Sequence, residues 1–437
     1  MQRSADHRAG KRIAVLNAVL ANAGDAAIAL GLVHSLRTAL GKDVQFTMYD
    51  SLPETTAPHY PEFDVHASVY TLAWKAEARG LVAKARRTVR WRIVRRRLLS
   101  RAERLGRRGQ ALGKHDASAG GILGALHASD LVISTGGTYL VEQYWLGPRL
   151  FELDLVQRLR RPLVLFTQSL GPFEKPAVRR ALHAVFRYAL LVLVRDDRSR
   201  QHALEVAPTA RVEVRADAAF ALAEPAVVQA ARTRALPTDR PLRIGISVRD
   251  WPHFTTMEAA TGMGRYREAV AHLVAHLVRE YNAEVVFIST CQGLPAYRYD
   301  DSRVAAAIVE KLPAEVRGHV TVETDYLRPE AIMKATGGCD LVVATRMHMA
   351  ILSLCAGTPV LPIAYEFKTR EVFGRLGMED RVQDIETVTG ERLADATERL
   401  LVDLPTVRAA LFARVEAERA DAMAAGVRVR EVIEANR

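Results

Sequence analysis

The sequence predicts an α/β protein of two Rossmann-like, doubly wound domains, and two observations lead to this prediction. Compact runs of Val, Ile and Leu without period-two alternation recur along the chain, as is typical of strands buried on both faces of a parallel sheet. Helical patterns such as residues 26–40 and 175–189 separate these runs, which indicates βαβ units. A chain of 437 residues is long enough for two such domains, each with its own core.

The expected strands fall into two series. The first series is residues 13–16, 44–48, 131–134, 163–166 and 191–194. The second series is residues 242–248, 284–289, 320–323, 341–344 and 360–363. Between them, residues 235–242 contain two prolines and several polar residues, which is typical of a linker. We therefore expect an N-terminal domain over 1–235, a C-terminal domain over 242–404 and a helix over 405–437.

Composition excludes several classes of protein. Hydrophobic residues make up 49% of the chain and charged residues 25%, which excludes a mostly disordered protein. The three cysteines form no C-x-x-C pair, so neither a disulfide framework nor a structural zinc site is expected, and we predict no metal site. There is no apolar stretch long enough to span a bilayer and no signal-peptide cleavage pattern, so we expect a cytoplasmic protein.

The formal net charge of +11 is concentrated in one segment. From Lys84 to Arg108 the chain has twelve Lys or Arg and one acid, Glu103, so the remainder is close to neutral. The segment lies in an expected insertion over about 73–125. Aliphatic residues give it a partial apolar stripe: Val89, Ile93 and Leu98. Two interpretations stay open, a solvated helix or a helix that contacts anionic lipid at the inner face of the cytoplasmic membrane. Nucleic acid is not an expected partner, because no nucleic-acid motif accompanies the charge.

Ligands of open parallel sheets bind at the carboxyl ends of the strands, so polar residues at these ends are the candidates for ligand contacts. After the first expected strand, Asn22, Gly24 and Asp25 introduce a helix whose N-terminus favours an anion or a polar sugar group. The segment lacks G-x-G-x-x-G, so a dinucleotide is not indicated. The alternative is that Asp25 only caps the helix.

Later strands of the first half carry further candidates. Gly136 and Gly137 follow the third strand, where they let the backbone approach a ligand or form a tight strand-to-helix turn. Gln168 and Ser169 follow the fourth strand with hydrogen-bonding side chains, for a ligand or for loop capping. Arg195 follows the fifth strand and either points towards a ligand or forms a structural ion pair with a neighbouring acid.

The second half carries a sharper pair, Arg346 and His348, after the expected strand at 341–344. A guanidinium binds carboxylate or phosphate in a bidentate way, and an imidazole transfers a proton near neutral pH. An acyl-like or phosphate-displacing transfer requires both groups. In the alternative, His348 caps the following helix and Arg346 pairs with Asp340 or Glu366.

Two more cations follow strands of the second half. Arg249 comes directly after residues 242–248, and Lys368 follows residues 360–363. Lys368 is expected to supply a second cation to the same anion, or else to be a solvated surface lysine.

Taken together, these segments resemble the polysaccharide pyruvyl transferase family. The matching pieces are N-A-G-D at 22–25, D-L-V-I-S-T-G-G at 130–137, Q-S-L-G-P-F at 168–173, V-R-D at 194–196, D-A-A-F at 217–220, I-S-V-R at 246–249, R-M-H at 346–348, and G-T-P-V with Y-E-F-K up to Lys368. They occur in the family's order over about residues 13–380. R-x-H followed by G-x-P and Y-x-x-K is the most specific part, whereas residues 73–125 match no family motif.

The resemblance implies a GT-B-like fold with the site in the interdomain cleft. It also implies phosphoenolpyruvate as donor substrate, no separate cofactor, and a lipid-linked oligosaccharide or polysaccharide precursor as acceptor, with a pyruvate ketal as product. His348 would then be the general acid and base, and Arg346 would hold phosphate or carboxylate. Arg195, Arg249 and Lys368 are the candidates for the remaining donor contacts.

Two other functions stay open. A nucleotide-sugar-dependent glycosyltransferase of the same fold would use an acidic residue such as Glu366 to bind a ribose. A non-catalytic, membrane-associated scaffold of polysaccharide assembly would tolerate replacement of Arg346 and His348.

Overall fold

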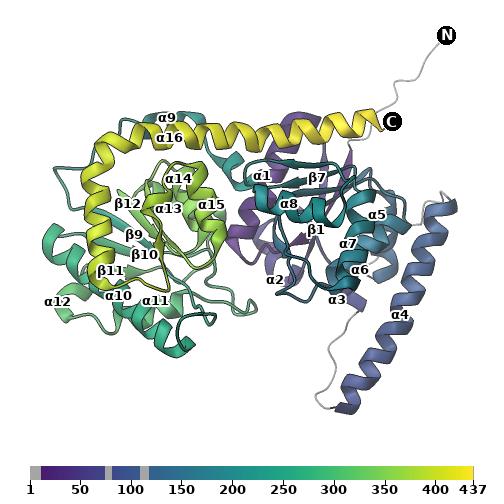
Figure 1. The fold of residues 1–437 in the computed structure, drawn as a ribbon, viewed down its shortest axis with the longest axis horizontal. Helices are drawn as coiled ribbons and strands as arrows, with labels where there is room; N and C mark the ends of the chain where they lie inside the picture. The colour runs from purple at the N-terminus through teal and green to yellow at the C-terminus, as the bar shows by residue number, and fades with distance from the viewer. Residues whose placement is uncertain (1–10, 74–80, 109–117, 437) are drawn as a thin grey trace, which may run out of the picture. The chain divides into compact units, whose positions relative to one another are not determined.

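Two parallel sheets organise the chain in the computed structural model, which describes residues 11–73, 81–108 and 118–436 (Figure 1). Contacts group the chain into two units. Unit 1 comprises Met1–Leu20, Leu32–Ala218 and Ala422–Arg437, and unit 2 comprises Ala21–Gly31 and Ala219–Asp421. The break at Ala218 precedes the expected linker at 235–242, which lies within unit 2 just before its first strand. The predicted fold class, two parallel doubly wound sheets, is confirmed.

The sheet of unit 1 has the order β3-β2-β1-β4-β6-β7-β8, with β5 paired to β6, and all its pairings are parallel. The strands are β1 (Arg12–Ala18), β2 (Gln45–Asp50), β3 (Asp64–Ala67), β4 (Leu131–Ser134), β5 (Gly137–Leu140), β6 (Leu163–Leu170), β7 (Leu191–Val194) and β8 (Val212–Val214). Because β1 is followed by β2 on one side and lies beside β4 on the other, the strand order reverses between β1 and β4. Such a switch point is where open sheets bind ligands.

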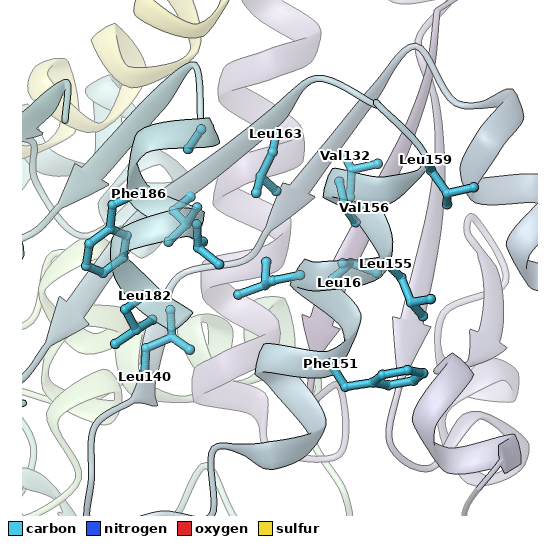
Figure 2. Close-up of a cluster of buried hydrophobic side chains, with 14 of the residues drawn as sticks. Leu16, Val132, Leu140, Phe151, Leu155, Val156, Leu159, Leu163, Leu182 and Phe186 are labelled. Carbon is cyan, nitrogen blue, oxygen red and sulfur yellow. The ribbon is translucent and has the colours of Figure 1, made fainter. Parts of the chain in front are cut away.

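Helices connect these strands and bury one apolar cluster with the sheet. They are α1 (Ala23–Leu40), α2 (Pro53–Thr56), η1 (Ala57–His59), α3 (Val69–Ala73), α4 (Leu81–Arg108), α5 (Ala119–Ala128), α6 (Gly147–Arg158), α7 (Pro176–Tyr188) and α8 (Asp197–Val206). Figure 2 shows part of the cluster, in which Val132 of β4 lies near Val156 of α6, and Leu140 of β5 lies near Leu182 of α7.

The arginine-rich segment forms α4, which packs against α6. Leu98, Leu99, Ala102 and Leu105 are buried in the apolar cluster of unit 1, whereas Val89 and Ile93 are 56% and 48% exposed. The expected stripe of Val89, Ile93 and Leu98 is therefore wrong, since Leu98 lies on the opposite side of the helix from Val89. At about 100° per residue, nine positions turn a side chain through half a circle. The C-terminal half of α4 thus contributes one side to the core of unit 1.

Unit 2 has a second parallel sheet with the order β11-β10-β9-β12-β13-β14. Its strands are β9 (Arg243–Ser247), β10 (Glu284–Phe287), β11 (Val320–Val322), β12 (Leu341–Ala344), β13 (Val360–Ala364) and β14 (Gln383–Asp384). Its helices are η2 (Ala218–Leu222, which begins at the last residue of unit 1), α9 (Pro225–Ala231), α10 (Ala259–Tyr281), α11 (Ser302–Val309), α12 (Ala314–Arg317), α13 (Pro329–Gly337), α14 (Met347–Cys355), α15 (Phe367–Arg375) and η3 (Glu379–Arg381). Here the strand order reverses between β9 and β12.

The C-terminal helix starts earlier than expected. It is α16 (Gly390–Ala435), and Pro405, the expected first residue, lies inside it. Figure 1 shows a bend in α16, which we attribute to this proline because it removes a backbone donor from the helix. Among the residues that the structure describes, no helix is long and apolar enough to cross a membrane.

Candidate active site

Unit 2 gathers functional side chains at the carboxyl edge of its sheet, on both sides of the switch point. Arg249 follows β9, while Arg346 and His348 follow β12, and these two strands are hydrogen-bonded neighbours. Arg346 occupies the N-cap position of α14, without a side-chain cap, and His348 lies in the first turn of that helix. The predicted position of Arg346 and His348 at a buried strand's carboxyl end is confirmed, and helix capping by His348 is not seen.

Arg346 is held by a carboxylate that the sequence did not single out. Its Nε and Nη2 donate to the two carboxylate oxygens of Asp301, at 2.8 and 2.7 Å. The side chains of Arg346 and Asp301 are only 12% and 2% exposed. Burial alone would lower the pKa of Arg346, but Asp301 outweighs burial and raises that pKa well above its usual range. Arg346 is therefore a fixed, permanently charged cation.

The alternative partners of Arg346 are engaged elsewhere. Asp340 accepts two hydrogen bonds from Arg240 at 2.8 Å, and Glu366 pairs with Lys368 at 2.6 Å. In Arg346, the Nη1 atom makes no hydrogen bond to a described residue, so one face of the guanidinium remains available to an anion. Bidentate support on one side with open donors on the other is a common arrangement for carboxylate or phosphate recognition.

Gly24 lies directly against His348, although 324 positions separate them in the sequence. A Cβ atom at position 24 would lie 2.8 Å from the Cβ of His348 and 3.0 Å from its Nδ1. The start of α1 is fixed there because the Ala23 N–H donates to the Thr290 carbonyl at 2.8 Å. Glycine at position 24 is thus needed for space beside the imidazole, and this contact brings the N-A-G-D and R-M-H segments together.

Asn22, rather than Asp25, directly precedes α1. Its Oδ1 accepts from the Gly24 N–H at 2.9 Å, and its Nδ2 donates to Asp25 Oδ2 at 2.7 Å. Asp25 lies in the first turn of the helix, where a negative charge is favourable. The negative charge of Asp25 also helps to raise the pKa values of Cys291 and Tyr297.

Cys291 and Tyr297 belong to this cluster, and sequence reasoning missed them. Burial raises the pKa of the Cys291 thiol to about 12 against the opposing effect of Arg346, so the thiol stays protonated near neutral pH. Burial also raises the pKa of Tyr297, with smaller contributions from Cys291 and Asp25. These residues follow β10, the strand next to β9, so the carboxyl-edge rule would have indicated them.

The ring of Tyr365 lies beside the two other candidate cations, Arg249 and Lys368. The Arg249 guanidinium lies 3.9 Å from its ring centroid and 4.7 Å from that of Trp251, and Lys368 Nζ lies 5.7 Å from the Tyr365 ring. Tyr365 also contributes to the raised pKa of Arg346. The Lys368 side chain is only 13% exposed, so it is not a solvated surface lysine. Arg249 and Lys368 thus share one aromatic ring.

Replacing Gly24 with alanine is expected to lower turnover by roughly 10–100-fold, because the new methyl group displaces the His348 ring from its working position. Helix propensity does not oppose the change, because alanine stabilises a helix interior by about 1 kcal/mol relative to glycine. Gly264→Ala on α10 is the matched control, because no atom lies within 4 Å of its Cβ position. Steady-state kinetics and urea unfolding measure both variants. Full activity in Gly24→Ala would contradict the assigned contact.

Unit 1 brings a second set of predicted residues together near its own switch point. Gln168 lies within β6 instead of following it, as does Ser169, because β6 continues to Leu170. Its Nε2 donates to the Thr135 carbonyl at 2.5 Å and to Ser134 Oγ at 3.3 Å, and Asn17 Nδ2 donates to the same Ser134 Oγ at 2.9 Å. The ends of β1, β4 and β6 are thereby tied to one another.

This corner of unit 1 holds unsatisfied polar atoms and strained backbone. Among the described residues, the buried atoms Gln168 Oε1, Thr135 Oγ1 and Thr167 Oγ1 have no hydrogen-bond partner. Such atoms cost free energy unless a ligand or water satisfies them. Asn17 and Thr167 also adopt positive φ angles of 62° and 42°. Strain of this kind concentrates at functional sites, so both observations favour a polar ligand here.

Arg195 is engaged entirely within unit 1. It donates from Nε to Ser169 Oγ at 2.6 Å, from Nη1 to Asp217 at 2.6 Å and from Nη2 to Thr138 Oγ1 at 2.9 Å. The Arg195 and Asp217 side chains are 3% and 1% exposed. The structure therefore shows the structural ion pair, with Asp217 rather than the adjacent acid as partner. Asp196 instead caps α8.

The paired glycines lead into a strand and not into a helix. Gly136 follows β4, and Gly137 begins β5, which pairs with β6. Gly137 has a φ of 126°, a conformation that L side chains rarely adopt. The expected strand-to-helix turn is thus wrong, and Gly137 is required by the backbone itself. Within the described ranges, no group of three His, Cys, Asp or Glu side chains is placed to hold a metal ion.

The chain matches the model of the family described as "Polysaccharide pyruvyl transferase" over residues 22–366, and it belongs to this family. The match includes Asn22, Gly24, Arg346 and His348, which lie in unit 2. A curated relative is the amylovoran biosynthesis protein AmsJ of Erwinia amylovora. It is 26% identical over 428 residues, covering 94% of this chain and 96% of the relative. The predicted resemblance is confirmed.

Solved structures support the fold assignment. The UDP-GlcNAc 2-epimerase of Neisseria meningitidis superposes with a TM-score of 0.57 at 11% identity, over 97% of this chain and 100% of the epimerase. The α,α-trehalose-phosphate synthase (UDP-forming) of Burkholderia vietnamiensis gives a TM-score of 0.54 at 13% identity, over 97% and 99% of the two chains. At such identities the likeness establishes the fold, which is that of GT-B enzymes, as expected.

Proposed function

We propose that this protein transfers the pyruvyl group of phosphoenolpyruvate to two hydroxyls of a sugar in a polysaccharide precursor, forming a pyruvate ketal. The observation that carries the proposal is the pairing of a fixed guanidinium, Arg346, with His348 at one strand end, together with the family membership. The named relative takes part in amylovoran biosynthesis, which supports a lipid-linked oligosaccharide or polysaccharide as acceptor. The reaction is proposed to occur in the cytoplasm.

The reaction balances with one proton carrier. Protonated His348 gives its proton to the methylene carbon of the donor while one sugar hydroxyl adds to the central carbon and passes its own proton to a phosphate oxygen of the donor, so that the phosphate later leaves as hydrogen phosphate. A second hydroxyl then displaces phosphate from that carbon, and neutral His348 takes up the proton that this hydroxyl releases. The products are the ketal, which keeps the pyruvate carboxylate, and inorganic phosphate. A single imidazole therefore acts first as acid and then as base.

The positive charges of Arg249, Arg346 and Lys368 match the negative charges of this donor. Arg346 is proposed to bind the phosphate or carboxylate through Nη1, and Arg249 and Lys368 to bind the remaining anionic oxygens. Asp301 and Glu366 hold Arg346 and Lys368 in place before the donor arrives. Within unit 1, the unsatisfied buried atoms around Gln168 are proposed to bind a polar ligand, with Gly136, Gly137 and Ser169 nearby in the chain.

Phosphoenolpyruvate is expected to raise the thermal midpoint of the purified protein, by about 2.7 kcal/mol of added stability at a hundredfold excess over its dissociation constant. Arg346→Met should abolish the shift, whereas the control Arg279→Met, at an exposed ion pair with Glu315, should retain it. Differential scanning fluorimetry with phosphoenolpyruvate and with nucleotide sugars provides the measurement.

Other outcomes of this titration distinguish the alternatives. A shift with nucleotide sugars and none with phosphoenolpyruvate would contradict the proposal and favour a glycosyltransferase that uses Glu366. No shift with either class, combined with full biological function of an Arg346→Met/His348→Gln variant, would favour the scaffold.

A further inference from the structure

The outward face of α4 combines exposed aliphatic side chains with a dense row of arginines. Val89 and Ile93 lie one helical turn apart and are 56% and 48% exposed. Arg92, Arg96 and Arg97 are exposed beside them and make no ion pair with a described residue. Figure 1 shows α4 along the outer side of unit 1, with its N-terminal end extending beyond α3. Between Val89 and Arg97 this face is therefore exposed.

The segment before α6 carries two exposed aromatic residues, and one of them, Trp145, lines a groove with two of these arginines. Trp145 and Tyr144 are 62% and 50% exposed. A groove of about 740 Å³ runs between α4 and α6, and its lining includes Trp145, Arg92 and Arg96. Trp145 stands edge-on to Tyr70, with ring centroids 5.7 Å apart. Because Trp145 lines the same groove as Arg92 and Arg96, we group the exposed residues of α4 and of the segment before α6 as the α4 face: Val89, Arg92, Ile93, Arg96, Arg97, Tyr144 and Trp145.

Folding of unit 1 does not account for the composition of the α4 face. The side of the helix that packs into the core is supplied by Leu98, Leu99, Ala102 and Leu105. The twelve basic residues of α4 and its acid Glu103 give +11, which equals the net charge of the whole chain. The acid Glu103 is itself paired, with Arg107 at 2.9 Å and Arg158 at 3.5 Å.

We propose that the α4 face docks on a bilayer containing anionic phospholipid. Arginines would lie at the phosphate headgroups, while the aliphatic and aromatic side chains enter the boundary between headgroups and acyl chains. Trp and Tyr favour this boundary because their rings are apolar with one polar end, and basic residues are attracted to the negative surface potential. A nucleic-acid backbone would match the charge but would leave Val89 and Ile93 against a polar surface.

The docking is independent of the reaction that the chain catalyses, and it is tested without an activity assay. The full chain is sedimented with vesicles of phosphatidylcholine plus phosphatidylglycerol, and with vesicles of phosphatidylcholine alone. Binding is expected to the anionic vesicles and to fall as salt is added, because exposed charges are screened. Equal binding to both vesicle types, or no binding to either, would overturn the proposal.

Point variants separate the electrostatic from the apolar contribution to vesicle binding. They leave the core of unit 1 intact, whereas deleting α4 would remove part of that core. Arg96→Gln/Arg97→Gln is expected to weaken vesicle binding by about tenfold or more, since each basic residue near a membrane contributes about a fivefold change. Val89→Ser/Ile93→Ser is expected to weaken it as well. The matched controls on α16 are Val402→Ser, at a 75% exposed position, and Arg399→Gln, at another exposed position; both should bind as the unmodified chain does.

A soluble anion in the groove is the competing occupant. Uridine diphosphate glucose serves as a soluble sugar diphosphate, and its binding is measured by calorimetry on the same variants. If Arg96→Gln/Arg97→Gln loses both vesicles and sugar diphosphate while Val89→Ser/Ile93→Ser binds vesicles normally, the groove is an anion site and the bilayer proposal fails. Circular dichroism melts of every variant establish that unit 1 remains folded.

Discussion

His348→Gln is expected to lower pyruvyl transfer by roughly 10²–10⁴-fold while the chain remains folded. Glutamine can still hydrogen-bond but neither donates a proton to carbon nor accepts one near neutral pH. The neighbourhood that fixes the ring, which is Gly24 and the first turn of α14, is unchanged by the substitution. Phosphate release from phosphoenolpyruvate in the presence of acceptor measures the rate.

The pattern of loss distinguishes a proton carrier from a structural residue. His319→Gln is the matched control, because His319 is exposed in the same unit and should keep full activity. Phosphoenolpyruvate should still stabilise His348→Gln against heat, since the proposed donor contacts are the cations. If His348→Gln transferred pyruvate at the normal rate, the acid–base role of His348 would be refuted.

Asp301→Ala is expected to destabilise the protein by about 3–5 kcal/mol, because the substitution leaves Arg346 charged and unpaired in a buried position. It also removes the acceptor of the Ser289 hydroxyl, which donates to Asp301 Oδ2 at 2.5 Å. Transfer should be lost too, since the guanidinium no longer has a fixed orientation. Urea unfolding followed by circular dichroism measures the free energy of unfolding.

A double substitution tests whether the loss comes from the uncompensated charge. Asp301→Leu/Arg346→Met should recover a large part of the stability, because an apolar pair replaces both charges, but it should remain inactive. Glu315→Ala removes one partner of the exposed pair with Arg279 and should leave the free energy of unfolding almost unchanged, because water screens this pair. If Asp301→Ala cost no more than this control, Asp301 would not be the anchor of Arg346.

The sequence predicted the central strands because these carry the clearest signal. Residues 131–134, 191–194 and 341–344 are β4, β7 and β12 to the residue, and each is buried on both faces. The strands that were missed are short or lie at the edges: β3, β5, β8 and β14 have two to four residues and carry less apolar sequence. Edge strands bury one side only, so their composition resembles that of loops.

The site was predictable where side chains follow strands, and less so where partners come from distant loops. Arg249, Arg346, His348 and Lys368 follow strands of unit 2 as expected. Asp301 lies in the long segment between β10 and α11, whose path no local pattern predicts. The contact between Gly24 and His348 requires the three-dimensional fold, because the first turn of α1 is grouped with unit 2.

The most direct test of the account is a mass spectrum of an oligosaccharide acceptor bearing two neighbouring hydroxyls after incubation with phosphoenolpyruvate and the purified protein. We expect an acceptor that carries a pyruvate ketal, with one phosphate released per ketal, and no product from the His348→Gln variant. An acceptor that gains a sugar from a nucleotide donor, with phosphoenolpyruvate left unconsumed, would contradict it.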